Sequence, residues 1–145
     1  MLIENKKARF NYELQDKLEA GIELLGFEVK ALRAKQGSLE GAYVIVRGNE
    51  AFLVNSFISP YQPKNTPKDY DPRRNRKVLL TKKEVAELAG AESQKGLTIV
   101  PISVYNKGRK IKVELAVARG KKKYDKREAI KKRDSEREVR REMKE

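Results

Sequence analysis

The 145-residue sequence contains no cysteine and no histidine. Without cysteine there is no disulfide framework and no thiolate metal site, so we expect a protein of the cytoplasm. Without histidine the chain lacks the commonest general base and the commonest metal ligand. No phosphate-binding loop, dinucleotide-binding glycine pattern or nucleophile elbow is present either. We therefore expect a protein that is not an enzyme and that needs no cofactor.

Long apolar stretches are also missing. No run approaches the roughly 20 apolar residues that a membrane span requires, and residues 1–7 lack the apolar stretch of a secretory signal. We therefore expect one domain with a modest core and no membrane partner. The chain is instead rich in charged residues. Its 34 Lys and Arg residues outnumber its 21 Asp and Glu residues, which gives a net charge of +13. Such a field attracts polyanions, nucleic acid first and anionic membrane surfaces second.

Residues 1–58 are expected to form strands separated by glycines. Alternation of polar and apolar residues over 9–14 predicts a half-buried strand, and the apolar run within 21–26 predicts another. Residues 28–35 favour one or two helical turns. Residues 42–46 and 51–54 flank a Gly-Asn pair, which is a hairpin signal.

Residues 59–77 are expected to be irregular, because they hold four of the five prolines. Six basic and two acidic residues give this segment a charge of +4. A loop of this length is either functional or disordered. It also contains Asp69 and Asp71, two acids that could begin a metal-dependent nuclease site but that have no third carboxylate partner in the sequence nearby.

Residues 78–119 return to regular structure. Thr81 and Glu84 fit a helix capping box, and Gly90 is the expected stop of that helix. Strands are expected over 97–106 and 110–118, with Pro101 at an edge or a bulge. The strand count predicts a mainly β fold, an oligonucleotide-binding-type β-barrel with two or three short flanking helices, over residues 1–119. An immunoglobulin-like sandwich is the alternative, and the intervening helices argue against it.

Residues 120–145 are expected to form a basic C-terminal tail. Twelve basic and seven acidic residues give it +5 of the total charge, and it has few apolar residues. Such a segment cannot offset its ordering entropy alone, so we expect disorder in isolation and a helix on meeting a polyanion. Gly120 is the expected hinge between barrel and tail.

Seven segments of the sequence resemble the SsrA-binding protein family, also called small protein B. They are NKKAR (5–9), EAGI (19–22), GFEVKALR (26–33), ISPY (58–61), DPRRNRK (71–77), GLTIVP (96–101) and GKKKYDKR (120–127). The resemblance runs from about residue 5 to the end, in the family's order and spacing. The sequence departs from the family pattern at four positions: Phe27, where Thr is usual, Thr81, where Asn or His is common, and Ser135 and Glu142, where larger apolar residues often lie.

The resemblance implies an adaptor that binds the tRNA-like domain of transfer-messenger RNA and delivers it to stalled ribosomes for trans-translation. The family's barrel grips the elbow of that domain. Its tail becomes helical in the messenger channel of the small subunit, beside the decoding centre. We expect a monomer bound to RNA. The alternative is a constitutive ribosomal protein of the same barrel-plus-tail design.

The residues expected to bind RNA are Lys6, Lys7, Arg9, Glu28, Lys30, Arg33, Arg73, Arg74, Arg76, Lys77, Leu79 and Thr81. The cations are candidates for phosphate contacts, or else an ordinary solvated face. The cluster at 73–77 is favoured, because no local acid neutralises it. Glu28 is assigned on the resemblance, and its replacement by Ala is expected to weaken RNA binding with the fold intact. From the sequence alone, Glu28 is a surface residue paired with Lys30 or Arg33.

Aromatic residues divide into two groups. Tyr12, Tyr43, Phe52, Phe57 and Tyr61 are either base-stacking platforms or core, and their spacing favours the core. Tyr124 has no apolar neighbours and, on the resemblance, stacks on a ribosomal base. The residues expected at the ribosomal decoding centre are Gly120, Lys121, Lys122, Lys123, Tyr124, Asp125, Lys126, Arg127 and Met143.

Overall fold

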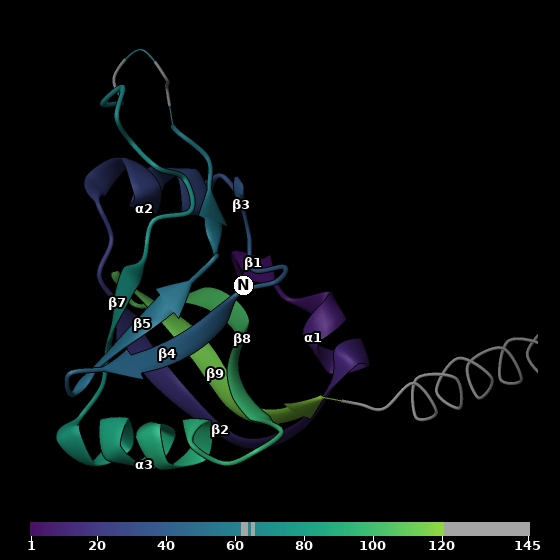
Figure 1. The fold of residues 1–145 in the computed structure, drawn as a ribbon. Helices are drawn as coiled ribbons and strands as arrows, with labels where there is room; N and C mark the ends of the chain where they lie inside the picture. Colours follow the sequence, from purple (N-terminus) through teal and green to yellow (C-terminus); the bar gives the residue numbers. More distant parts are fainter. Residues whose placement is uncertain (62–63, 65, 121–145) are drawn as a thin grey trace, which may run out of the picture.

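A computed structural model describes residues 1–61, 64 and 66–120, and Figure 1 shows their arrangement. The mainly β fold is confirmed, with three helices among these residues. In chain order the elements are β1 (Ile3–Glu4), α1 (Lys6–Asn11), β2 (Tyr12–Ile22), α2 (Gly26–Arg33), β3 (Gly37–Ser38), β4 (Tyr43–Arg47), β5 (Glu50–Val54), β6 (Phe57–Ile58), β7 (Arg76–Leu79), α3 (Lys82–Glu92), β8 (Leu97–Lys107) and β9 (Lys110–Gly120).

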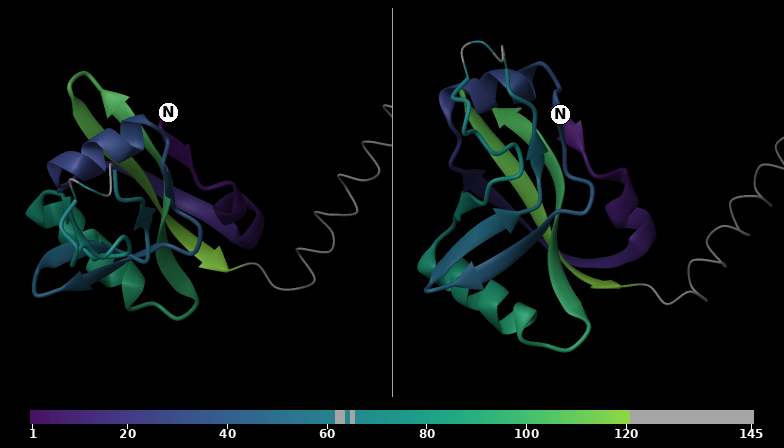
Figure 2. Two further views of the ribbon diagram at one scale, coloured as in Figure 1. Left: turned by 90° about the horizontal axis from the view of Figure 1, so that it is seen from above. Right: turned by 45° about the horizontal axis from the view of Figure 1, so that its top comes forward.

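One antiparallel sheet organises the molecule. Its strand order is β1-β8-β4-β5-β7-β2-β9, and β9 also pairs with β8, so six strands form a ring of pairings that returns on itself. β3 and β6 form a separate pair. Helix α3 packs against β4 and β8, and α1 packs against β2 and β8. Figure 2 shows α2 lying across the other end of the strands from α3.

The predicted Gly-Asn hairpin is confirmed, and the strands predicted over 97–106 and 110–118 pair with each other. β4 and β5 pair up to Arg47 and Glu50, and the two loop residues between them, Gly48 and Asn49, have φ of 58° and 66°. Two positive φ angles are what a type I′ turn requires. β8 and β9 pair along their length, and the register shifts just after Pro101, which is the predicted bulge. A bulge leaves one residue out of the ladder and so tolerates a residue without an N–H group.

The N-terminal prediction was wrong at two places. Residues 9–11 belong to helix α1 rather than to a strand, and the second predicted strand is the end of β2 followed by a loop. Helix α1 forms because the Asn5 side chain accepts a hydrogen bond from the Ala8 backbone N–H (3.2 Å). Ala8 is then buried against Ile102 of β8. This contact between distant segments outweighs the local alternation.

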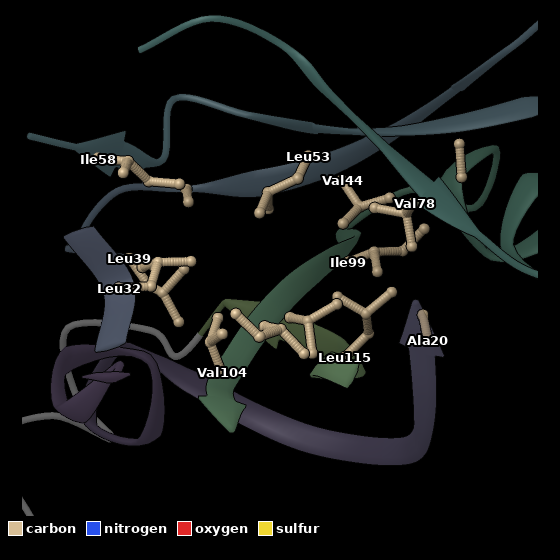
Figure 3. Packing of buried hydrophobic residues seen from close by; sticks show 14 of the residues in the cluster. Ala20, Leu32, Leu39, Val44, Leu53, Ile58, Val78, Ile99, Val104 and Leu115 are labelled. Carbon is tan, nitrogen blue, oxygen red and sulfur yellow. The ribbon is translucent and has the colours of Figure 1, made fainter. Parts of the chain in front are cut away.

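The core is aliphatic. Leu32, Leu53, Leu88, Ile99 and Leu115 are each at most 2% exposed. Figure 3 shows several of these side chains, from α2, β5, β8 and β9, pointing into one common interior. The prediction that aromatic residues fill the core is confirmed only in part. Tyr12 and Tyr61 are half-buried and pack against the aliphatic core, Phe52 and Phe57 are half-buried, and Tyr43 is exposed. Along β4 and β5 the inward positions belong to aliphatic residues, so the alternating aromatic residues face outward.

The predicted capping box of α3 is confirmed. The Glu84 backbone N–H donates to Thr81 Oγ1 (3.2 Å), and the Thr81 backbone N–H donates to Glu84 Oε1 (3.0 Å). The helix continues past Gly90 to Glu92, so the predicted stop was two residues early. None of the helices within residues 1–61, 64 and 66–120 combines the length and apolarity needed to cross a membrane.

Candidate nucleic-acid interface

The predicted RNA-binding cations lie on two separate parts of the molecule. Lys6, Lys7 and Arg9 are exposed on α1, whereas Lys30 and Arg33 are exposed on α2. Figure 1 shows these two helices on different sides of the sheet. Lys7 forms an exposed ion pair with Glu40 (Nζ–Oε1 2.6 Å). The predicted cations therefore cannot all belong to one compact binding site.

The basic cluster at 73–77 is partly neutralised by two acids, contrary to our expectation. Arg76 is 0% exposed, Arg74 is largely buried, and both pair with the carboxylate of Glu28. Lys77 pairs with Glu50 (Nζ–Oε1 3.1 Å). Only Arg73 is well exposed, with its guanidinium over the Phe57 ring at 5.4 Å. A direct phosphate contact by Arg76 is incompatible with its complete burial.

Glu28 is buried, so its description as a surface residue paired with Lys30 or Arg33 was wrong. Its side chain is 0% exposed and accepts hydrogen bonds from the Leu25 backbone N–H (2.8 Å), Arg74 Nη2 (2.5 Å) and Arg76 Nε (2.8 Å). Burial alone would raise the pKa of Glu28, but the hydrogen bonds from Arg74 and Leu25 and the charge of Arg76 lower it overall. The carboxylate is therefore ionised inside the protein.

Tyr70 and Arg76 complete this buried cluster. The Tyr70 hydroxyl lies 2.9 Å from Glu28 Oε2 and accepts a hydrogen bond from Arg76 Nη2 (3.0 Å). Burial, together with the hydrogen bond to Glu28 and its charge, raises the pKa of Tyr70 to about 12. The Tyr70 and Phe27 rings pack in a T-shaped arrangement with a centroid distance of 4.7 Å. Phe27, one of the departures from the family pattern, thus packs against the cluster.

A shallow hollow of about 310 Å³ lies beside Leu79, between α2, the end of β2, β7 and the start of β9. Leu79, which is 50% exposed, belongs to the predicted RNA-binding set. The floor of the hollow is apolar, and three cations edge it at the start of β9. Its lining residues are Gly21, Ile22, Leu24, Val29, Leu79, Arg109, Lys110, Ile111 and Lys112.

Sequence reasoning missed the three cations at this edge. Lys110 and Lys112 alternate with the core residues Ile111 and Val113, so the same pattern that predicts a buried face also predicts an outward basic face. The predicted residue Arg33 joins them, because its Nη2 donates to the Arg109 carbonyl at 3.4 Å. The structure therefore brings together residues from α2, β7 and β9.

A polar group adjoins the hollow on the neighbouring strands. The Tyr105 hydroxyl donates to Glu19, and Lys107 Nζ lies 2.9 Å from Glu19 Oε1. Tyr105 is paired with Lys112 across the β8–β9 ladder. Hydrogen bonds from Tyr105 and Lys107 lower the pKa of Glu19, whereas burial and the contact with Glu19 raise the pKa of Tyr105 to about 12. The charge of Lys112 also lowers the pKa of Glu19, so this carboxylate offsets part of the positive charge at the edge of the hollow.

Thr81 uses its hydroxyl to cap α3, so the structure gives this residue a local role. Gly120 is exposed and ends β9 opposite Tyr12. The remaining predicted tail positions, Lys121, Lys122, Lys123, Tyr124, Asp125, Lys126, Arg127, Ser135, Glu142 and Met143, lie outside the described residues.

A closed run of strand pairings, an aliphatic core and an apolar hollow edged by cations are features expected of a small nucleic-acid-binding protein. The comparisons with known proteins agree with this class. A protein-family model described as "SmpB protein" matches residues 2–145. The chain belongs to the SmpB protein family.

Named relatives and a solved structure resemble the chain over most of its length. The SsrA-binding protein of Caldicellulosiruptor bescii is 52% identical, covering 97% of this chain and 89% of its own. That of Microcystis aeruginosa is 46% identical, covering 99% and 94%. A chain of the structure described as "tmRNA-SmpB: a journey to the center of the bacterial ribosome" superposes with a TM-score of 0.71 and 43% identity, covering 88% of this chain and 93% of its own.

Proposed function

We propose that this protein binds the tRNA-like domain of transfer-messenger RNA and delivers it to stalled ribosomes for trans-translation. The observation that carries the proposal is the hollow around Leu79, where Arg33, Arg109, Lys110 and Lys112 surround an apolar floor. The family's names supply the ligand, since its relatives are SsrA-binding proteins and the solved neighbour is a tmRNA–SmpB structure. Such an adaptor works in the cytoplasm without a catalytic step or a cofactor.

The proposed fold type is an oligonucleotide-binding barrel. Its support is the ring of pairings among β8, β4, β5, β7, β2 and β9, since a sheet whose last strand pairs with an earlier one has the connectivity of a small barrel. The domain division into residues 1–119 and a tail of 120–145 is part of the same proposal.

The hollow suits a folded RNA better than a regular duplex groove. Its cations can contact phosphates while the exposed Leu79 side chain contacts a sugar or a base face. We infer recognition of RNA shape, with phosphate contacts providing most of the affinity. Residues Lys6, Lys7 and Arg9 on α1 form a second exposed basic group, available to another part of the RNA or to ribosomal RNA.

In this proposal the tail residues 120–145 act on the ribosome rather than in the hollow. Their +5 charge favours a channel lined with RNA. Tyr124 stacks on a base of the decoding centre, and Lys126 and Arg127 contact phosphates. A constitutive ribosomal protein is not favoured, because the relatives take their name from an RNA outside the ribosome.

The test measures affinity for a tRNA-like RNA and for a single strand of equal length across a salt series. We expect tight binding of the folded RNA, far weaker binding of the single strand, and a steep loss with salt as phosphate-bound counterions are released. A protein cut after Arg119 should keep most of this affinity but fail to start peptide tagging on stalled ribosomes. Equal affinity for the two RNAs would overturn the proposal.

A further inference from the structure

The buried cluster around Glu28 joins the elements that form the hollow. Glu28 lies on α2 beside Val29, which lines the hollow, and Arg76 begins β7, where Leu79 follows three residues later. The bond between Arg76 Nε and Glu28 Oε2 (2.8 Å) is therefore a direct link between two sides of the hollow. Arg74, two residues before β7, adds two more hydrogen bonds to the same carboxylate (Nε–Oε2 3.1 Å, Nη2–Oε1 2.5 Å).

We propose that Glu28 and Arg76 are positioning residues for RNA binding, which set the separation of α2 and β7 without touching the RNA. The inference rests on the proposed function. A carboxylate in an RNA site is unfavourable unless it accepts hydrogen bonds from the RNA. Here both oxygens of Glu28 accept bonds from inside the protein, and the side chain is 0% exposed. A contribution to RNA binding therefore comes through geometry.

The directionality of Arg76 explains how one side chain can set this geometry. Its planar guanidinium donates in fixed directions to the carbonyls of Ser56 (3.1 Å), Pro72 (3.0 Å) and Arg74 (3.1 Å) as well as to Glu28. Apolar residues of equal volume often stabilise a core as well as a buried ion pair does, but they do not impose directions. The ion pair therefore holds the segment before β7 in one position relative to α2.

Tyr70 allows the cluster to be loosened without changing any charge. Its hydroxyl accepts from Arg76 Nη2 (3.0 Å) and lies 3.0 Å from the Ile58 carbonyl, while its ring packs on Phe27. Tyr70→Phe removes the hydroxyl but keeps the ring, both arginines and the carboxylate. The number of cations that can face the RNA stays the same, so any loss of affinity reports on position.

The experiment compares two variants of the cluster with two variants of the core residue Ile99, which is fully buried on β8 and does not line the hollow. Tyr70→Phe is matched with Ile99→Val, and the harsher Glu28→Gln with Ile99→Ala, so that each pair loses similar stability. RNA affinity is measured for all four well below their unfolding temperatures. We expect Tyr70→Phe to weaken binding of the tRNA-like RNA about three- to tenfold with an unchanged salt slope. Ile99→Val should bind as the wild type does.

Two results would overturn the positioning role. One is wild-type affinity in Tyr70→Phe, and the other is an equal loss in Tyr70→Phe and Ile99→Val, which would make the cluster merely structural.

Failure of the proposed function is seen separately, as a wild type that binds folded and single-stranded RNA equally. Hydrogen exchange without RNA then tests the cluster alone: Tyr70→Phe should speed exchange at Val29 and Leu79 more than Ile99→Val does, and equal exchange overturns the proposal.

Discussion

Two basic segments of similar charge density lie in different environments in this molecule. Residues 73–77 hold four cations in five positions, and residues 109–112 hold three in four. Three of the four cations in the first segment pair with Glu28 or Glu50, and Arg76 within it is completely buried. The second segment edges an apolar hollow on the surface. Charge density along a sequence therefore does not identify a binding surface.

The difference arises from acids that are remote in sequence. Glu28 lies 46 residues from Arg74 and 48 from Arg76. In the β9 segment, the residues directly opposite Lys112 on the two neighbouring strands are Tyr105 and Gly21, and neither is an acid. Strand register, which pairs residues far apart in the chain, thus decides which cations are compensated and which remain available to a polyanion.

The largest expected effect is on the stability of the first segment. Arg76→Met leaves the Glu28 carboxylate buried with one partner fewer, and we expect a loss of about 3–5 kcal/mol in the free energy of unfolding. Urea unfolding measures it, with Arg109→Met as the control from the second segment, expected to change stability by less than about 0.5 kcal/mol. For the same reason Glu28→Ala should no longer be expected to leave the fold intact. Equal losses in the two methionine variants would contradict the comparison.

The next effect is on RNA affinity through the second segment. Lys110→Ala combined with Lys112→Ala should reduce the slope of log affinity against log salt by about 0.7–0.9 for each phosphate that the variant no longer neutralises. Stability should stay unchanged, because both side chains lie on the outer face. The matched control is Lys83→Ala combined with Lys95→Ala, two exposed lysines outside the hollow. If both double variants show the same reduction in slope, the positive charge acts diffusely and the hollow has no special role.

A smaller effect concerns pH. The pKa of Tyr70 is raised to about 12 from an ordinary value of 10, so the folded protein holds this proton more tightly than the unfolded chain. The resulting stability is fully present below about pH 10 and is lost as the pH rises from 10 towards 12. Tyr70→Phe should therefore show a shallower fall in melting temperature between pH 9 and pH 11.5 than the wild type does. Parallel curves would mean that Tyr70 is not coupled to Glu28.

The smallest effect concerns the shape of the hollow. A Cβ atom at Gly21 would lie 3.1 Å from the Leu79 Cβ, a tight contact that pushes the leucine outward. Gly21→Ala should therefore weaken RNA binding by less than the double lysine variant does, with an unchanged salt slope because no charge is removed. Gly90→Ala is the control, since nothing lies within 4 Å of that added Cβ. A changed slope in Gly21→Ala would show that the cations, rather than the floor, had moved.

Local signals predicted the later part of the fold better than its start. The Thr81 capping box, the Gly48-Asn49 turn and the bulge after Pro101 follow from backbone rules that act within a few residues, and all three are present. Helix α1 was missed because its stability comes from Ala8 packing on Ile102, a contact across more than 90 residues. Tyr43 and Phe52 were misplaced because alternation shows that two faces of a strand differ but does not say which one is inside.

The sequence by itself determined the mainly β class, the excess of positive charge, the hairpins and the family, because these depend on composition, on short-range backbone chemistry and on motifs in order. Only the tertiary structure decided which charges face solvent. It buried Glu28 with Arg76, and it gathered Arg33, Leu79 and Lys112 around one hollow. The physical reason is that burial and ion pairing are set by contacts between strands and helices distant in sequence. Such contacts cannot be predicted from any short stretch of the chain.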